Sequence, residues 1–131
     1  MKVIVTCKEN YRESLIGQKD YLVIEIYVSV RKQKISYRIS DEQGTLAIYN
    51  NDLFVIKDPA LSGYSIKTEN LSTLITVTKL LELDKVSGDV NGLWVEYFDG
   101  DVETTKKIHK IIKEYAKTQN IEINEPISYS I

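Results

Sequence analysis

The sequence predicts an α+β fold: a small antiparallel β-barrel meander, then one long C-terminal amphipathic helix and a C-terminal edge strand. Over roughly the first 60 residues, apolar positions repeatedly alternate with other positions, which is the period of a strand that buries one face. Near the C-terminus, apolar positions recur at intervals of three and four, which is the period of a helix. The length of 131 residues suits a single domain, with 1–67 as the barrel meander and 68–131 as its extension.

The alternation is strongest from Tyr21 to Val30. The even positions of this stretch are all apolar, whereas Glu25 and Ser29 occupy odd positions, so we expect one buried and one exposed face. The polar residues 31–34 suit a hairpin turn, and apolar positions alternate with polar ones again over 35–40. These residues therefore predict a β-hairpin.

Three more strands are expected from shorter patterns. The turn at 41–44 ends in Gly44, which tolerates a positive φ, and residues 45–49 form the next expected strand. Residues 53–56 and 3–7 supply two others. Because closure removes exposed strand edges, five short antiparallel strands predict a closed barrel.

The pattern of residues 71–83 fits two structures. Val77 and the neighbouring threonines favour a strand, whereas the leucines of this stretch also fit helical spacing. Of the two, we expect a strand. Beyond residue 120, apolar and polar residues alternate over 121–124 and again over 127–131, which predicts one or two edge strands.

Residues 102–119 predict the amphipathic helix, because lysines lie opposite its apolar stripe. Asp101 is the expected N-cap, and Glu103 lies near the positive end of the helix dipole. An EF-hand calcium loop does not fit because, counted from Asp99, the position of the closing glutamate holds Lys110. We therefore interpret the carboxylates before the helix as a turn and a cap. The apolar stripe consists of Ile108, Ile111, Ile112 and Tyr115.

The residue types give little support for catalysis. Cys7 is the only cysteine, so the chain forms neither an internal disulfide nor a thiolate zinc cluster, and we expect a buried side chain. His109 is the only histidine, and its position at the border of the apolar stripe predicts a boundary residue. A nucleophile pair of Cys7 and His109 has no support beyond the presence of both residues. Without a phosphate-binding loop, a dinucleotide fingerprint or a nucleophile elbow, we expect no enzyme, no metal and no cofactor.

The composition also predicts where the protein is located and which class of partner it does not bind. The chain has no signal-peptide core and no apolar run of about 18 residues, which predicts a cytoplasmic protein that does not enter a membrane. A net charge of −2 disfavours a nucleic-acid partner, because such proteins gather many basic residues.

Residues 82–103 form an acidic block, in which seven carboxylates and one lysine give a charge of −6. Such charge speeds the encounter with a basic partner, while the aromatic residues inside the block supply affinity. The lone Trp94 also suits a core position, because tryptophan is usually highly buried. The expected partner-binding residues are Asp84, Asp89, Trp94, Glu96, Tyr97 and Phe98.

Nine tyrosines offer a second candidate surface. Tyr21 and Tyr27 lie on the odd face of the long strand, and Tyr49 is expected on the matching face of the third strand. These rings either cover the edges of the barrel or form a binding surface. The cations near them are Arg31, Lys32, Lys34 and Arg38.

Five short motifs follow one another along the chain: Met1-Lys2-Val3, Gly17 with Tyr21-Leu22-Val23, Tyr37 to Gly44, Leu53 to Asp58, and Phe98 to Asp101. Their order resembles a group of small bacterial proteins. The resemblance implies an SH3-like barrel with an added helix. Some members of that group look like immunity proteins encoded beside bacterial toxins, and no catalytic residues come with the resemblance.

Two functional hypotheses follow. In the first, the chain is a cytoplasmic protein-binding protein, such as an immunity protein that neutralises a basic toxin domain through the acidic block. In the second, it is an SH3-like module that binds a peptide or a nucleic acid through the tyrosine face. An enzyme ranks last because the sequence contains no recognisable catalytic constellation.

Overall fold

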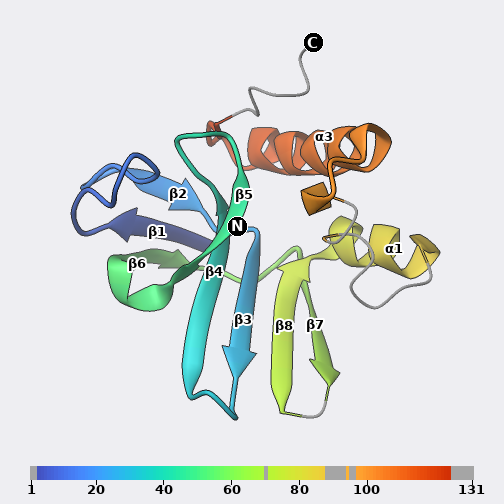
Figure 1. Cartoon of the computed structure of the whole chain (residues 1–131), viewed down its shortest axis with the longest axis horizontal. Helices are drawn as coiled ribbons and strands as arrows, with labels where there is room; N and C mark the ends of the chain where they lie inside the picture. The colour runs from blue at the N-terminus through green and yellow to red at the C-terminus, as the bar shows by residue number, and fades with distance from the viewer. Residues whose placement is uncertain (1–2, 70, 88–93, 95–96, 125–131) are drawn as a thin grey trace.

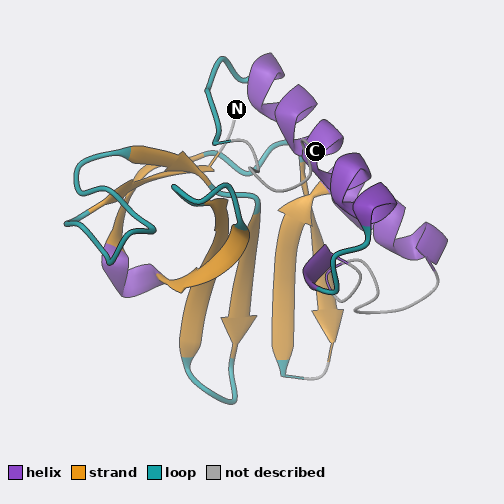
Figure 2. Ribbon diagram, turned by 45° about the horizontal axis from the view of Figure 1, so that its top comes forward, coloured by secondary structure: helices purple, strands orange, loops and turns teal. Residues whose placement is uncertain are grey.

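In the computed structural model, two antiparallel β-sheets pack beside each other, and helix α3 lies across one end of them (Figures 1 and 2). The structure describes residues 3–69, 71–87, 94 and 97–124. The three-stranded sheet has the order β2-β1-β6, with bounds β1 Val3–Cys7, β2 Asp20–Leu22 and β6 Phe54–Pro59.

The second sheet has five strands in the order β5-β4-β3-β8-β7. Its two hairpins, β3–β4 and β7–β8, point the same way, and their turns lie at the end of the molecule opposite α3 (Figure 1). The bounds are β3 Glu25–Ser29, β4 Lys34–Ser40, β5 Leu46–Asn50, β7 Tyr64–Glu69 and β8 Ser72–Val77.

The α+β class is therefore confirmed, but the described strands form two sheets and no closed barrel. The predicted strand from Tyr21 to Val30 divides between the sheets. The amide of Val23 donates to the Val3 carbonyl (2.9 Å) in the first sheet, whereas the next amide, that of Ile24, donates to the Arg38 carbonyl (2.8 Å) in the second. The chain changes partners at this point, and both faces become buried, so the expectation of one exposed face is wrong here.

The prediction for residues 71–83 is right only for its first half. Strand β8 ends at Val77, and helix α1 (Thr78–Ser87) begins at the next residue. Leu80 of this helix is buried in a cluster with Ile108 of α3. Packing against α3 thus favours the helical alternative that the leucine spacing allowed.

Helix α3 (Val102–Thr118) confirms the predicted helix and its cap. The Asp101 carboxylate accepts a hydrogen bond from the Thr104 amide (2.9 Å), and Ile108 and Ile112 are buried. His109 is also buried, with only 4% of its surface exposed, so its interpretation as a boundary residue is wrong. The buried stripe is wider than the isoleucine spacing indicates.

Residues 121–124 are not a strand, in contrast to the prediction. The Ile121 amide donates to the Ala116 carbonyl (3.0 Å), and the Ser40 hydroxyl donates to the Asn124 carbonyl (2.5 Å). The Asn124 side-chain amide in turn donates to the Glu42 carboxylate (2.9 Å). The other predicted edge strand, 127–131, lies outside the described residues.

Most of the described tyrosines serve the fold. Tyr21 and Tyr37 both pack edge-on against Phe54 in the core between the sheets. Tyr49 donates its hydroxyl proton to Asp41 (2.6 Å), and burial together with this hydrogen bond raises the pKa of Tyr49 to about 12. The interpretation that these rings cover the protein's own strands is thus supported for most of them.

These tyrosines predict a steep loss of stability at alkaline pH. An unfolded tyrosine loses its proton near pH 10, whereas burial raises the pKa of seven folded ones. The folded chain therefore binds more protons above about pH 10, so stability is complete below that value and falls as the pH rises further. The seven are Tyr21, Tyr27, Tyr37, Tyr49, Tyr64, Tyr97 and Tyr115.

Ultraviolet absorbance of the phenolate, recorded beside circular dichroism, checks this prediction. We expect most of the phenolate signal to appear together with unfolding. If most of that signal develops around pH 10 while the dichroism stays native, the prediction is contradicted.

Candidate functional site

One face of the five-stranded sheet carries an unusual set of polar side chains. Cross-strand partners share a face because side chains alternate along each strand. In the first row across this face, Ser65, Thr76, Glu25, Arg38 and Ile48 lie side by side. The next row, toward the hairpin turns, is Lys67, Leu74, Tyr27, Ser36 and Asn50.

The first row contains a buried ion pair. Arg38 is 3% exposed and Glu25 is 2% exposed, although the sequence pattern placed Glu25 on an exposed face. The Arg38 Nε atom donates to Glu25 Oε1 (3.1 Å), and its Nη1 atom donates to the Leu46 carbonyl (2.7 Å). Thr76 donates its hydroxyl proton to Glu25 Oε2 (2.7 Å). The hydrogen-bond partners of the two charged groups come from strands β3, β4, β5 and β8. Additional hydrogen bonds of this kind offset the cost of burying an ion pair.

Tyr27 connects this pair to the second row. Its hydroxyl donates to Glu25 Oε1 (2.6 Å) and accepts from Arg38 Nη2 (3.1 Å). Burial, reinforced by the adjacent Glu25 carboxylate, raises the pKa of Tyr27. The hydroxyl therefore stays protonated and bridges the pair over the ordinary pH range.

The aromatic residues of the acidic block cover Arg38. Its guanidinium carbon lies 3.8 Å from the centre of the Trp94 ring and 5.7 Å from that of Phe98. The Tyr97 hydroxyl accepts from the Leu46 amide (3.0 Å) and lies 3.5 Å from His109 Nε2. Trp94 and Tyr97 are half-buried, whereas Phe98 is 57% exposed.

The structure thus brings three of the six expected partner-binding residues together. Asp89 and Glu96 lie outside the described residues, and Asp84 belongs to α1 with its side chain outside them. Trp94, left between core and surface by the sequence, packs against the sheet as a half-buried residue.

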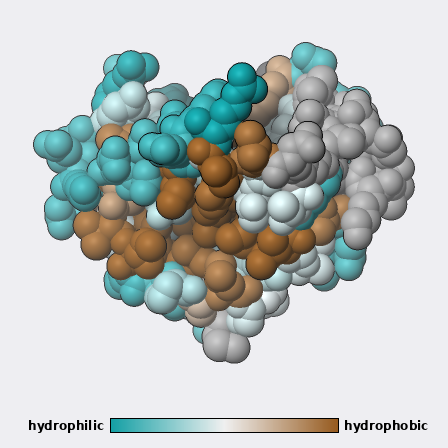
Figure 3. Space-filling model, turned by 90° about the horizontal axis from the view of Figure 1, so that it is seen from below, coloured by the Kyte–Doolittle hydropathy of each residue, from teal (hydrophilic) through white to brown (hydrophobic). Residues whose placement is uncertain are grey.

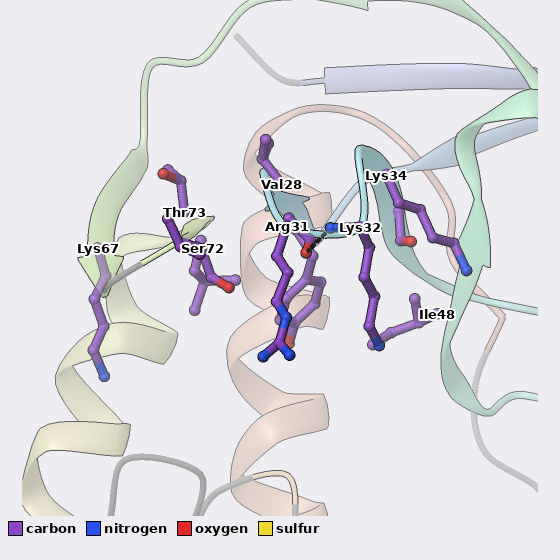
Figure 4. Close-up of a pocket in the computed structure, with 13 residues that line it drawn as sticks. Val28, Arg31, Lys32, Lys34, Ile48, Lys67, Ser72 and Thr73 are labelled. Carbon is purple, nitrogen blue, oxygen red and sulfur yellow. Dashed lines mark hydrogen bonds between the residues drawn. The ribbon is translucent and has the colours of Figure 1, made fainter.

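Beyond Tyr27, the same side of the sheet opens into a groove of about 640 Å³ between the two hairpins (Figure 4). Arg31, Lys32 and Lys34 line it from the β3–β4 hairpin, and Lys67 lines it from β7. Figure 4 shows these four side chains extending in roughly the same direction. None of the described lining residues is acidic. The others are Tyr27, Val28, Ser29, Ser36, Ile48, Leu71, Ser72, Thr73 and Leu74.

The groove matches the predicted tyrosine surface only in part. Tyr27 meets the expected hairpin cations there, but Arg38 is buried behind it. Tyr21 belongs to the other sheet, and Tyr49 pairs with Tyr37 on the opposite face, so the expectation of a shared tyrosine face is wrong. Lys67, Leu74 and Ile48 also line the groove, and the sequence does not indicate them because their positions depend on strand register.

The other candidate residues are built into the core. Cys7 is fully buried, as predicted, and its thiol donates to the Glu9 carbonyl (3.1 Å); burial raises its pKa. Across the described residues, no three histidine, cysteine or acidic side chains are grouped to hold a metal ion. The described helices include none with the length and apolar character needed to cross a membrane.

Replacing Arg38 by methionine is expected to lower the free energy of unfolding by about 3–5 kcal/mol, because the Glu25 carboxylate would stay buried without its cation. The double variant Glu25→Leu/Arg38→Met removes both charges and should recover a large part of that loss. Urea denaturation measures both.

Lys57→Met is the matched control, because it breaks an ion pair with Asp20 whose lysine is 62% exposed. We expect it to change stability by at most about 1 kcal/mol. An Arg38→Met variant no less stable than this control would show that the buried Glu25–Arg38 pair does not stabilise the fold in this way.

No protein-family model, no curated protein and no solved structure matches the chain. The resemblance to small SH3-like bacterial proteins therefore stays a prediction, and the function is inferred from the geometry of the site.

Proposed function

We propose that the protein is a binding protein that holds an acidic segment of a partner protein in the cationic groove. The observation that carries this proposal is that four cationic side chains line one groove whose described lining contains no carboxylate. Arg31, Lys32 and Lys34 are exposed, and none of them forms an ion pair with a described acidic residue. Such an arrangement attracts and orients an anionic ligand.

The lining favours a peptide over a nucleic acid. Proteins that bind single strands stack successive bases on several aromatic rings, whereas Tyr27 is the only aromatic residue in the described lining. Leu71, Leu74 and Ile48 offer apolar surface that suits aliphatic side chains. The volume of about 640 Å³ also falls within the range of ordinary ligand sites.

The proposed peptide-binding role agrees with the SH3-like architecture that the sequence indicates. A strand that switches sheets through a bend or a bulge is how small orthogonal sandwiches and barrels turn their corners. The switch at Val23–Ile24 and the register shift in β1 between Ile4 and Val5 support such a relationship. We propose the two sheets as an opened variant of that architecture.

An oligo-glutamate peptide tests the groove. The double variant Lys32→Glu/Lys34→Glu should weaken its binding at least about tenfold in isothermal calorimetry, since two cations of the site become anions. Lys106→Glu/Lys110→Glu makes the same change in net charge on the exposed side of α3 and should leave the affinity within about twofold.

Equal weakening by both double variants would mean that net charge, and not the groove, binds the peptide. Absence of binding even at low salt would also overturn the proposal. Tighter binding of single-stranded oligothymidylate than of the peptide, lost in Lys32→Glu/Lys34→Glu, would favour the nucleic-acid alternative.

A second binding role is supported by the end of the acidic block. Phe98 and Val102 are 57% and 52% exposed, and Asp99, Asp101 and Glu103 beside them are exposed as well. Exposed apolar side chains ringed by carboxylates suit a basic protein surface. This corner supports the proposal of an immunity protein that neutralises a basic toxin domain.

For this role, Asp99→Asn/Glu103→Gln should weaken binding of an oligo-lysine peptide and flatten its salt dependence, while Asp101 is spared as the helix cap. Asp52→Asn/Glu114→Gln removes two exposed carboxylates elsewhere and serves as the control. If both double variants bind the peptide equally, the corner is not a basic-partner site. Fluorescence anisotropy of a labelled peptide measures the difference.

A further inference from the structure

The groove lies beside an edge of its sheet. Within the described residues, β7 forms backbone pairs with β8 alone and ends the strand order β5-β4-β3-β8-β7. A strand in this position presents backbone N–H and C=O groups to which another chain can pair. Lys67, which lines the groove, belongs to this strand.

The register identifies which backbone groups face outward. The Thr78 amide donates to the Gly63 carbonyl (3.0 Å), so these two residues face each other as a hydrogen-bonded pair. The pairing continues without a shift to Glu69 and Ser72, and hydrogen-bonded pairs alternate along an antiparallel ladder. The backbone groups of Ile66 and Thr68 therefore point away from β8.

The side chains on the two faces at this edge differ in chemistry. On the groove face, Lys67 lies on the same side as the cations of the β3–β4 hairpin. On the opposite face, Ile66 is 65% exposed, and the register aligns it with Ile75 and Ile26, both half-buried.

Hydrophobic surface extends beyond this row. Figure 3, which views the molecule from below, shows a band of hydrophobic residues across the end where the hairpin turns lie. The exposed apolar side chains of the two hairpins include Val30, Ile35 and Ile66.

We infer that β7 accepts an extended segment of the partner protein as a sixth strand, and that this segment alternates acidic and apolar residues. This inference rests on the proposed function, because the acidic side chains are the ones that enter the cationic groove. Successive side chains of an added strand point to opposite faces of the sheet. Those on the groove side therefore lie beside Lys67, at the β7 side of the groove, and those on the other side extend the apolar row of Ile66 and Ile75.

Two peptides of six residues, the length of β7, test this inference. One alternates glutamate and valine, and the other has the same composition with three glutamates followed by three valines. The alternating peptide should bind about tenfold more tightly. In amide hydrogen exchange followed by NMR, it should slow the exchange of the Ile66 and Thr68 amides, whose protons face outward.

Backbone N-methylation of the alternating peptide provides a test on the unaltered protein. In one methylated peptide, the methyl groups are on the alternate residues whose amides would pair with β7. This peptide should bind no more tightly than the peptide of three glutamates followed by three valines. In the second methylated peptide, the methyl groups are on the remaining residues, whose amides would face away from the sheet. This peptide should keep the higher affinity of the alternating peptide.

Ile66→Pro gives the matching change in the protein. It removes an outward amide and leaves the pairing with β8 intact, which is the position where an edge strand tolerates proline. We expect this variant, with a circular dichroism spectrum like that of the parent, to bind both peptides equally. If it fails to fold, the N-methylated peptides decide the question.

These experiments distinguish strand addition at β7 from the binding of an acidic segment in the groove. Equal affinity for both peptides, or no difference between the two methylated peptides, would overturn strand addition while groove binding stands. Lys67 would then act as a charge that protects the edge. If neither peptide nor oligo-glutamate binds, both the inference and the proposed function fail.

Discussion

Burial of the Arg38 guanidinium beside the Glu25 carboxylate constrains four strands of the second sheet at once. The pair draws a hydroxyl from Thr76 in β8, a carbonyl from Leu46 in β5 and a hydroxyl from Tyr27 in β3. Because an unpaired buried charge is costly, a shift in register at any of these strands would leave one charge without its partners. The Trp94 ring then closes this part of the sheet face by stacking on the guanidinium.

The open groove is the continuation of this closed region. Tyr27 belongs to both, since its hydroxyl bridges the ion pair while its side chain lines the groove. The strands that carry the pair also join the two hairpins, because β3 pairs with β8. Lys34 and Lys67 lie on strands of this sheet, whereas Arg31 and Lys32 lie in the turn between β3 and β4. Side chains on strands are more precisely positioned than those on loops.

Local patterns predicted the parts of the fold that depend on near neighbours. Helix α3 and its Asp101 cap follow from spacing and capping chemistry, and the β3–β4 hairpin from alternation around a polar turn. The division of the first long strand at Val23 depends instead on two different partner strands, which alternation does not reveal. For the same reason, the sequence indicated the hairpin cations near Tyr27, whereas Lys67 joins them only through the pairing of β7 with β8.

NMR of the Arg38 Nε–H group tests most directly whether the guanidinium is buried under the Trp94 ring and paired with Glu25. We predict a resolved Nε–H signal that exchanges slowly with water and shows nuclear Overhauser contacts to the Trp94 ring, because Nε donates to Glu25 and the ring covers the guanidinium. An averaged signal that exchanges rapidly and shows no contact to Trp94 would contradict it.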